Sequence, residues 1–220
     1  MLYNRLGNGN DVIALAQTGT GKTAAYGIPV LQKVNPEEKH TQALILSPTR
    51  ELCLQIADDL ADFSKYVSGL HVVPVYGGAS IEMQIRQLRK GAQIIVATPG
   101  RLIDLMKRGV AQLDAVNKLG RDGNDEMLNM GFTESINAIF EGVPTNRNTL
   151  LFSATMSREI EKIAKNYLNN YKEIVVGSRN EGAEKVNHIY YMVNAKDKYL
   201  ALKRLVDFYP RIFAIIFCRT

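Results

Sequence analysis

The segment "DVIALAQTGTGKTAAYG" contains the residues best suited to chemistry in this sequence of 220 residues. An apolar run leads into a glycine-containing loop, which is followed by Lys22, Thr23 and a helical pattern. Gly19 and Gly21 allow backbone N–H groups to approach phosphate oxygens, and the start of the following helix attracts the same anion. Lys22 can reach terminal phosphates, and the Thr23 hydroxyl can bind Mg²⁺. The segment therefore predicts a phosphate-binding loop, although Ala16 replaces the first glycine of the strict pattern.

Four more short motifs follow later apolar runs along the chain. They read "SPTRELCLQ" (47–55), "YGG" (76–78), "ATPGRLIDL" (97–105) and "LFSATM" (151–156). Each comes at the expected end of a strand, which is where open α/β sheets bind ligands. Thr49 and Thr98 offer hydroxyl donors, while Arg50 and Arg101 add positive charge near helix starts. Each motif alone is also a common way to begin a helix, but the four together favour a surface that binds a sugar–phosphate backbone.

Elements that could position these motifs alternate along the first 178 residues. Apolar runs rich in Val, Ile and Leu occupy residues 11–17, 42–47, 71–76, 93–98, 148–154 and 173–178. Helical patterns lie between them, at residues 22–34, 50–67, 80–89, 100–108, 124–140 and 157–169. Runs without polar alternation are typical of strands that are covered on both faces. The sequence therefore predicts an α/β fold with a mostly parallel sheet and helices on both sides.

The last part of the chain has a different pattern. A polar segment at 179–185 is typical of a linker, and it follows a first domain predicted at 1–178. We expect strands at 186–193 and 211–218 on either side of a helix at 195–209. This order predicts a truncated βαβ piece of a second domain at 186–220.

In this chain order, the motifs AQTGTGKT, PTRELCLQ, GG, TPGR and SAT resemble those of the DEAD-box ATP-dependent RNA helicases. The resemblance covers essentially the whole sequence, and the terminal "AIIFCRT" is similar to the first motif of that family's second RecA-like domain. It implies a RecA-like P-loop domain that uses ATP and Mg²⁺. It also implies RNA as a partner, as a single strand or short duplex bound through its backbone. The family's protein cofactors cannot be inferred from these motifs.

The resemblance also implies roles for residues at matching positions. ATP would be held by Ala16, Gln17, Thr18, Gly19, Thr20, Gly21, Lys22 and Thr23. RNA would be contacted by Pro48, Thr49, Arg50, Gly78, Thr98, Pro99, Gly100 and Arg101. Mg²⁺ would be bound by Thr23 and Asp122. The catalytic set would be Lys22, Asp122, Asp125, Ser153 and Thr155, in which the last two couple hydrolysis to strand separation.

The segment "KLGRDGNDEMLNMGF" (118–132) departs from the family pattern at its acidic motif. Where that family has Asp-Glu-Ala-Asp, this chain has Asp122, Gly123, Asn124 and Asp125. Gly123 has no side chain to position the attacking water, a loss that typically lowers a rate by roughly 10²–10⁴-fold. Gly120 and Arg121 replace large aliphatic residues, and Arg121 would bury an unpaired charge. We therefore expect a damaged hydrolytic motif with local strand disorder between about 117 and 126.

Composition and charge fit these predictions. The net charge of +5, from 27 basic and 22 acidic side chains, suits a polyanionic partner. Cys53 and Cys218 lack metal-ligand spacing and are typical of a reducing compartment. No apolar run approaches the ~20 residues of a membrane span, and the N-terminus lacks the pattern of a signal peptide. We expect a cytoplasmic protein without a membrane partner.

The sequence thus predicts RNA-stimulated ATP hydrolysis coupled to local unwinding of an RNA duplex. We expect this activity to be impaired by Gly123 and by truncation, since "MLYNRLGNGN" is too short for the adenine-reading segment of the family. One alternative is a non-hydrolysing module that binds nucleotide and RNA. Another is a P-loop enzyme acting on a small molecule, which would need a substrate lid for which the sequence offers no candidate.

Overall fold

The computed structural model describes residues 10–17, 19–176, 187 and 189–218. The chain divides into two compact units, Met1–Glu181 and Gly182–Thr220.

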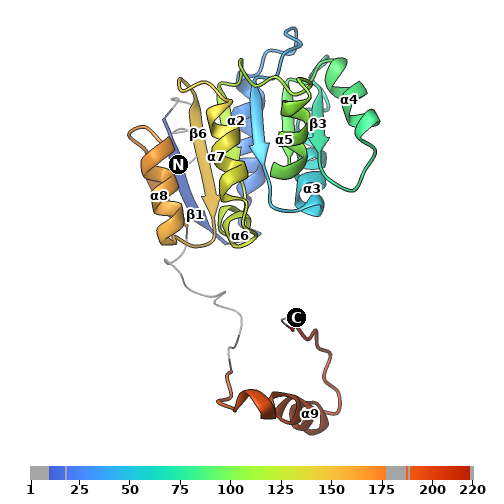
Figure 1. Ribbon diagram of the computed structural model, residues 1–220, viewed down its shortest axis with the longest axis vertical. Coiled ribbons are helices and arrows are strands. Elements are labelled where there is room, and N and C mark those ends of the chain that lie inside the picture. Colours follow the sequence, from blue (N-terminus) through green and yellow to red (C-terminus); the bar gives the residue numbers. More distant parts are fainter. Residues whose placement is uncertain (1–9, 18, 177–186, 188, 219–220) are drawn as a thin grey trace. The chain divides into compact units, whose positions relative to one another are not determined.

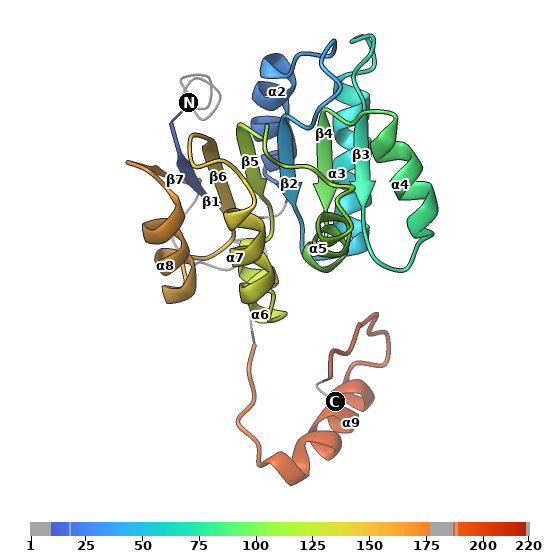
Figure 2. The same ribbon diagram turned by 45° about the horizontal axis from the view of Figure 1, so that its top comes forward.

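A seven-stranded sheet in the order β3-β4-β2-β5-β6-β1-β7 runs through the described part of the first unit (Figures 1 and 2). Its strands are β1 (Val12–Ala16), β2 (Ala43–Leu46), β3 (Val72–Val75), β4 (Ile94–Ala97), β5 (Lys118–Arg121), β6 (Asn148–Ser153) and β7 (Lys172–Val176). Every pairing between neighbouring strands is parallel. The carboxyl ends of all strands therefore lie at the same edge of the sheet.

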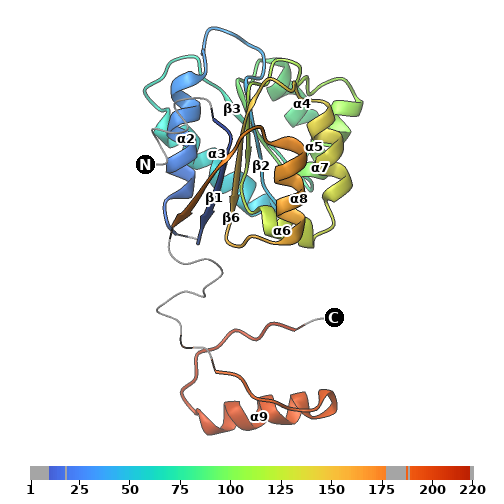
Figure 3. The same ribbon diagram turned by 90° about the vertical axis from the view of Figure 1, so that its left-hand side faces the viewer.

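Helices cover both faces of this sheet, as Figure 3 shows with the sheet seen nearly edge-on. On one face lie α2 (Lys22–Lys33) and α3 (Arg50–Phe63). On the other lie α4 (Ile81–Arg89), α5 (Pro99–Lys107), α6 (Asn124–Asn129), α7 (Thr133–Glu141) and α8 (Arg158–Tyr167). The predicted α/β fold, with a parallel sheet between two helical layers, is confirmed. The helix expected at 124–140 is in fact two helices, α6 and α7.

The apolar core explains why the strands read as continuous apolar runs. Successive side chains of a strand point to opposite faces of the sheet. In β2, Ala43 and Ile45 pack with the residues of α2 and α3, whereas Leu44 and Leu46 pack with those of α5 and α7. A strand that is covered twice must therefore be apolar at every position.

β5 is a regular strand, so the expected disorder between 117 and 126 is wrong. The strand pairs with β2 on one side and β6 on the other, and these backbone hydrogen bonds do not depend on side-chain type. Arg121 is fully buried, and its Nε, Nη1 and Nη2 have no hydrogen-bond partner among the described residues. Its guanidinium carbon lies 5.7 Å from the ring centroid of Phe140. Burial lowers the pKa of Arg121 to about 9.

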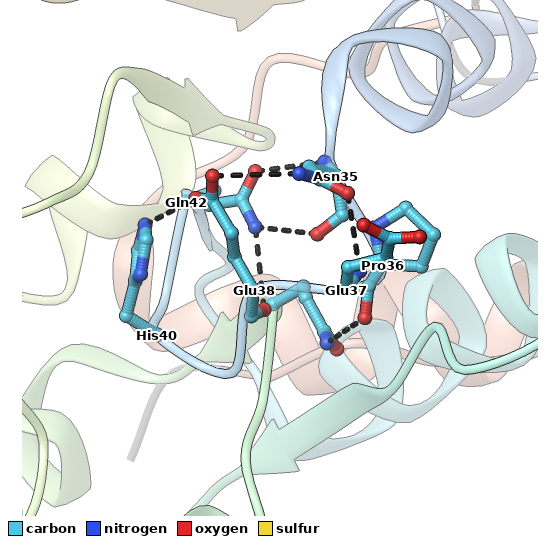
Figure 4. Close-up of polar contacts among 7 residues, drawn as sticks. Asn35, Pro36, Glu37, Glu38, His40 and Gln42 are labelled. Carbon is cyan, nitrogen blue, oxygen red and sulfur yellow. Dashed lines mark hydrogen bonds and ion pairs between the residues drawn. The ribbon is translucent and has the colours of Figure 1, made fainter.

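A polar network closes the connection between α2 and β2, at the amino end of β2 (Figure 4). The side-chain amide of Gln42 accepts a hydrogen bond from the Asn35 N–H and donates one to the Asn35 carbonyl, both at 2.8 Å. In the same turn, His40 Nε2 lies 3.0 Å from a Glu38 carboxylate oxygen. These bonds satisfy backbone groups of the loop, and they stabilise the sheet edge opposite the phosphate loop.

The second unit contains a short 3₁₀ turn (Ala195–Asp197) followed by α9 (Lys198–Phe208). The strands expected at 186–193 and 211–218 are absent from the described residues of those segments. A strand needs a neighbour to pair its N–H and C=O groups, and the described part of this unit offers none. The boundaries at 178 and 185 stay a prediction, since residues 177–186 are not described. Within the described residues, no helix has the length and apolar character needed to cross a membrane.

Candidate active site

A cavity of ≈ 660 Å³ opens at the carboxyl edge of the sheet and brings together segments that are distant in sequence. The phosphate loop, α3 and the start of α6 form most of its wall. Its lining residues are Gly19, Gly21, Lys22, Thr23, Ala24, Thr49, Glu51, Leu52, Gln55, Asp59, Phe63, Asp122, Gly123, Asp125, Glu126 and Ala154. The cavity therefore contains much of the predicted ATP-binding, metal-binding and catalytic sets.

The phosphate loop is curled so that α2 points its N-terminus into the cavity. Gly19 and Gly21 have φ angles of 80° and 78°, which L side chains rarely adopt. An added Cβ at either glycine would meet nothing within 4 Å in the described structure, so the space beside the loop is open. Lys22 Nζ donates to the Ala16 carbonyl at 3.0 Å and thereby spans the base of the loop. This arrangement can cradle an anion.

The rest of the loop has a local, structural role. Thr20 Oγ1 donates to the Gln17 carbonyl at 2.7 Å, which fixes the turn between them. Neither residue lines the cavity. Thr18, also predicted to hold ATP, lies outside the described residues.

Asp122 holds a carboxylate beside the phosphate loop. It follows β5 directly, it is 5% exposed, and its backbone N–H donates to the Leu46 carbonyl at 2.9 Å. Burial raises the pKa of Asp122, while the positive charge of Lys22 acts in the opposite direction. Tyr26 Oη donates to Asp122 Oδ2 at 3.2 Å. The predicted carboxylate is therefore present, buried and fixed in orientation.

The oxygen ligands available here suit Mg²⁺. The Thr23 hydroxyl and the Asp122 carboxylate line the same cavity as Lys22. Within the described residues, no group of three or more His, Cys, Asp or Glu side chains could hold a metal by itself. Mg²⁺ commonly takes only one or two protein carboxylates and completes its shell with water and substrate phosphates. The donor set therefore fits a metal that arrives together with a nucleotide.

At Gly123 the wall of the cavity is bare backbone. Its φ is 67°, and a Cβ built on it would lie 2.9 Å from Pro48 Cγ and 3.0 Å from Pro48 Cδ. Contacts below 3.0 Å require a neighbour to shift. The position therefore lacks a side chain and also has a backbone shape that disfavours one.

The remaining catalytic candidates lie beside this cavity. Asp125 borders both the main cavity and a smaller one of ≈ 310 Å³, which Thr155 also lines. Ser153 is buried at the end of β6, and its Oγ accepts a hydrogen bond from the Thr155 N–H at 3.4 Å. Asp125 and Thr155 are thus neighbours, whereas Ser153 supports the backbone of the segment.

The residues predicted to contact RNA lie at the carboxyl ends of β2, β3 and β4. The guanidinium of Arg50 stacks over Tyr76, 5.2 Å from the ring centroid, and it lies next to Gly78. Arg101 Nη1 donates to the Ala79 carbonyl at 3.2 Å. Thr49 caps α3 by accepting the Leu52 N–H at 3.2 Å. Both arginines are therefore oriented by neighbouring segments.

The other four members of this set divide into exposed and buried positions. Thr98 is half-buried at the start of α5, and its side chain makes no capping hydrogen bond to that helix. Gly100 is exposed, and an added Cβ there would meet nothing within 4 Å among the described residues. Pro48 and Pro99 are buried and shape the starts of their helices. The prolines therefore position the surface more than they form it.

Two groups of residues, one bonded to a cavity residue and one lining the cavity itself, were not predicted from the sequence. Tyr26 lies one helical turn after Lys22, so it shares a face of α2 with the phosphate loop. On α3, one face of the helix lines the cavity with three polar side chains and one aromatic side chain, namely Glu51, Gln55, Asp59 and Phe63. Their spacing of four residues places them in one row along the helix, and that regular spacing was visible in the sequence.

A parallel sheet with a glycine loop between β1 and α2, and with a lysine and a threonine at the start of α2, defines a P-loop nucleotide-binding domain of the RecA-like type. A family model for DEAD/DEAH box helicases matches residues 2–163. The chain belongs to the DEAD/DEAH box helicase family.

Known relatives are similar over almost the whole chain. It is 42% identical over 213 residues to "ATP-dependent RNA helicase DeaD" of Haemophilus influenzae, an alignment that covers 97% of this chain and 35% of the relative. It is 46% identical over 212 residues to "DEAD-box ATP-dependent RNA helicase CshA" of Streptococcus pneumoniae, with 96% and 40% covered. The chain thus spans well under half the length of these relatives.

Solved structures of similar proteins have the same fold. A DEAD box protein from the hyperthermophile Methanococcus jannaschii superposes with a TM-score of 0.75 at 38% identity, covering 93% of this chain and 55% of that one. A hypothetical ATP-dependent RNA helicase from Sulfolobus tokodaii gives a TM-score of 0.73 at 40% identity, with 80% and 50% covered.

Proposed function

We propose that this chain is the ATP-binding domain of an ATP-dependent RNA helicase, in which ATP hydrolysis is coupled to local unwinding of an RNA duplex. The observation that carries the proposal is the single cavity that joins Lys22 and Thr23 to Asp122. Support also comes from the similar proteins of Haemophilus influenzae and Streptococcus pneumoniae, which are named as ATP-dependent RNA helicases.

The triphosphate would bind at the start of α2. Backbone N–H groups after Gly21 and the ammonium group of Lys22 would neutralise its charge. Mg²⁺, when bound, supplies a positive charge between the phosphates, and Thr23 and Asp122 are the residues that would hold it. Asp125 and Thr155 share the wall of an adjoining cavity, so we assign them the link between the phosphate site and the segment after β6.

RNA would bind along the carboxyl ends of β2, β3 and β4. Arg50 and Arg101 would pair with phosphates, while Thr49 and Thr98 would donate or accept hydrogen bonds at the backbone. Contacts of this kind carry no base information, so the proposed binding is largely independent of sequence. Because they neutralise phosphates, affinity should fall steeply as salt increases.

Hydrolysis by this chain should be slow because Gly123 offers no side chain to position water. This same observation favours a second candidate function, a module that binds nucleotide and RNA without turnover. The cytoplasmic location inferred from the sequence stays a prediction.

Phosphate release, measured with and without single-stranded RNA, tests the proposal and separates the two candidates. The proposed function predicts slow turnover that increases when RNA is added. Retention of labelled RNA and of nucleotide without phosphate release would favour the binding module instead. If neither ATP nor RNA binds to the chain, both functions are wrong.

A further inference from the structure

The hydroxyl of Tyr26 is close to the side chains of Thr23 and Asp122, which the sequence motifs assigned to Mg²⁺. Tyr26 Oη donates to Asp122 Oδ2 at 3.2 Å, and the Thr23 side chain is within hydrogen-bonding reach of the same phenol. A phenol has one donor and can also accept, so it can bond to both residues at once. It therefore connects α2 to the end of β5 through a single oxygen atom.

Packing holds this phenol in place. Tyr26 is 1% exposed, and its ring centroid lies 4.8 Å from that of Phe152 in β6, with the rings tilted by 47°. Because the ring is buried on α2 between the helix and the sheet, the hydroxyl has little freedom to turn elsewhere. A hydroxyl that is fixed in this way can orient a neighbouring carboxylate.

Beyond a hydrogen bond from the Gly123 backbone, the residues next to Asp122 in sequence provide little support for its carboxylate. Gly123, the next residue, has no side chain and a left-handed backbone. Asn124 is fully buried, and its amide atoms have no hydrogen-bond partner among the described residues. Arg121 points its unpartnered guanidinium towards Phe140. Of these neighbours in sequence, none has a side chain that bonds to Asp122, whereas Tyr26 does.

We propose that Tyr26 is a positioning residue for the Mg²⁺ site. Its hydroxyl holds the Thr23 hydroxyl and the Asp122 carboxylate in the geometry that a nucleotide-bound metal requires. The proposal rests on the proposed nucleotide-binding function and deepens it. Partners behind metal ligands fix the ligand orientation, and their loss typically weakens metal binding by roughly 10–100-fold.

The substitution Tyr26→Phe tests this because it removes only the hydroxyl and keeps the ring against Phe152. A matched control is Tyr167→Phe, which removes a phenol that donates to Asn137 Oδ1 at 2.8 Å and stacks on Phe140, outside the cavity. Mn²⁺ serves as the probe, and its binding to the complex of the 220-residue chain with ADP is measured by electron paramagnetic resonance. ADP affinity is measured separately in EDTA by calorimetry.

Tyr26→Phe should weaken Mn²⁺ binding to the ADP complex by about 10-fold or more. Its ADP affinity in EDTA should stay within about twofold of that of the unmodified chain, and Tyr167→Phe should change neither quantity. Unchanged Mn²⁺ binding in Tyr26→Phe would overturn this inference alone. An unmodified chain that binds no ADP would overturn the proposed function and this inference with it.

A crystal structure of the unmodified chain with ADP and Mn²⁺ decides the matter if Tyr26→Phe fails to fold. A phenol oxygen bonded to Asp122 beside a Mn²⁺ ion supports the assignment. A phenol turned away from both Thr23 and Asp122 refutes it.

Discussion

Replacing the buried Arg121 with leucine should stabilise the protein. In β5 this guanidinium is 0% exposed, and its three nitrogens have no hydrogen-bond partner among the described residues. A cation–π contact with Phe140, in which the guanidinium carbon lies 5.7 Å from the ring centroid, partly offsets the cost of burying this charge. Arg121→Leu places a shorter apolar side chain of similar volume in the strand and removes the buried polar group.

The magnitude follows from two opposing contributions. Each buried donor left without a partner costs roughly 1–3 kcal/mol, and a desolvated cation–π contact returns about 2 kcal/mol. Replacing buried charges with apolar residues of similar volume stabilises proteins by roughly 1–4 kcal/mol. We expect about 2–4 kcal/mol, which at this size raises Tm by roughly 5–15 °C.

The free energy of unfolding in urea and the Tm by calorimetry are measured for the unmodified chain and for Arg121→Leu. Arg147→Leu is the control, because Arg147 is half-buried and donates to the Val143 and Pro144 carbonyls, so its loss should lower stability. Burial lowers the pKa of Arg121 to about 9, so above that pH the folded state sheds a proton that the unfolded state keeps. The stability of the unmodified chain should then rise, and its deficit relative to Arg121→Leu should narrow. Equal or lower stability of Arg121→Leu at pH 7 would refute this reasoning.

Two further predictions concern the acidic motif. Gly123→Ala should lower the free energy of unfolding by roughly 1–3 kcal/mol in urea titrations, because its φ is 67° and the added Cβ would lie 2.9 Å from Pro48 Cγ. Gly123→Glu should be destabilised similarly, and an unfolding midpoint equal to that of the unmodified chain would contradict both expectations. Asp122→Asn should raise Tm at pH 7 but much less at pH 4. Because burial raises the pKa of Asp122, the folded state takes up a proton at a higher pH than the unfolded state, and stability increases as pH falls through that folded pKa. An equal shift in Tm at both pH values would count against a buried, charged carboxylate.

Much of the fold could be predicted from the sequence because the strands are covered on both faces. Ala43 to Leu46 illustrate this, since each residue of β2 meets a helix and must be apolar. The prediction failed at β5, where Arg121 and Gly120 suggested disorder. Backbone pairing with β2 and β6 holds that strand whatever its side chains are.

In the second unit, the sequence predicted strands that the described residues do not form. Its apolar runs have the composition of strands, but pairing depends on neighbours that composition cannot supply. Ile189, Met192 and Phe213 consequently remain exposed in segments without regular secondary structure. Local pattern predicted α9 correctly because a helix satisfies its own backbone hydrogen bonds.

The candidate site could be predicted where the residue types and spacing of a motif indicate a specific chemistry, as the phosphate loop does at Lys22 and Thr23. The role of Tyr26 could not be predicted, because it depends on a contact with a residue 96 positions away. The row from Glu51 to Phe63 could have been found from its spacing, but not the cavity it faces. Contacts between distant segments are therefore the part that required the structure.

Calorimetric titration of Lys22→Ala with ADP and Mg²⁺ tests the nucleotide site most directly. Lys65→Ala is the control, since Lys65 is exposed and lies over Tyr66, away from the cavity. Hydrogen bonds to charged groups contribute roughly 1.5–3 kcal/mol, so Lys22→Ala should bind at least about 10-fold more weakly. Lys65→Ala should match the unmodified chain. Equal affinity of Lys22→Ala and the unmodified chain would contradict the assignment of this cavity to a nucleotide.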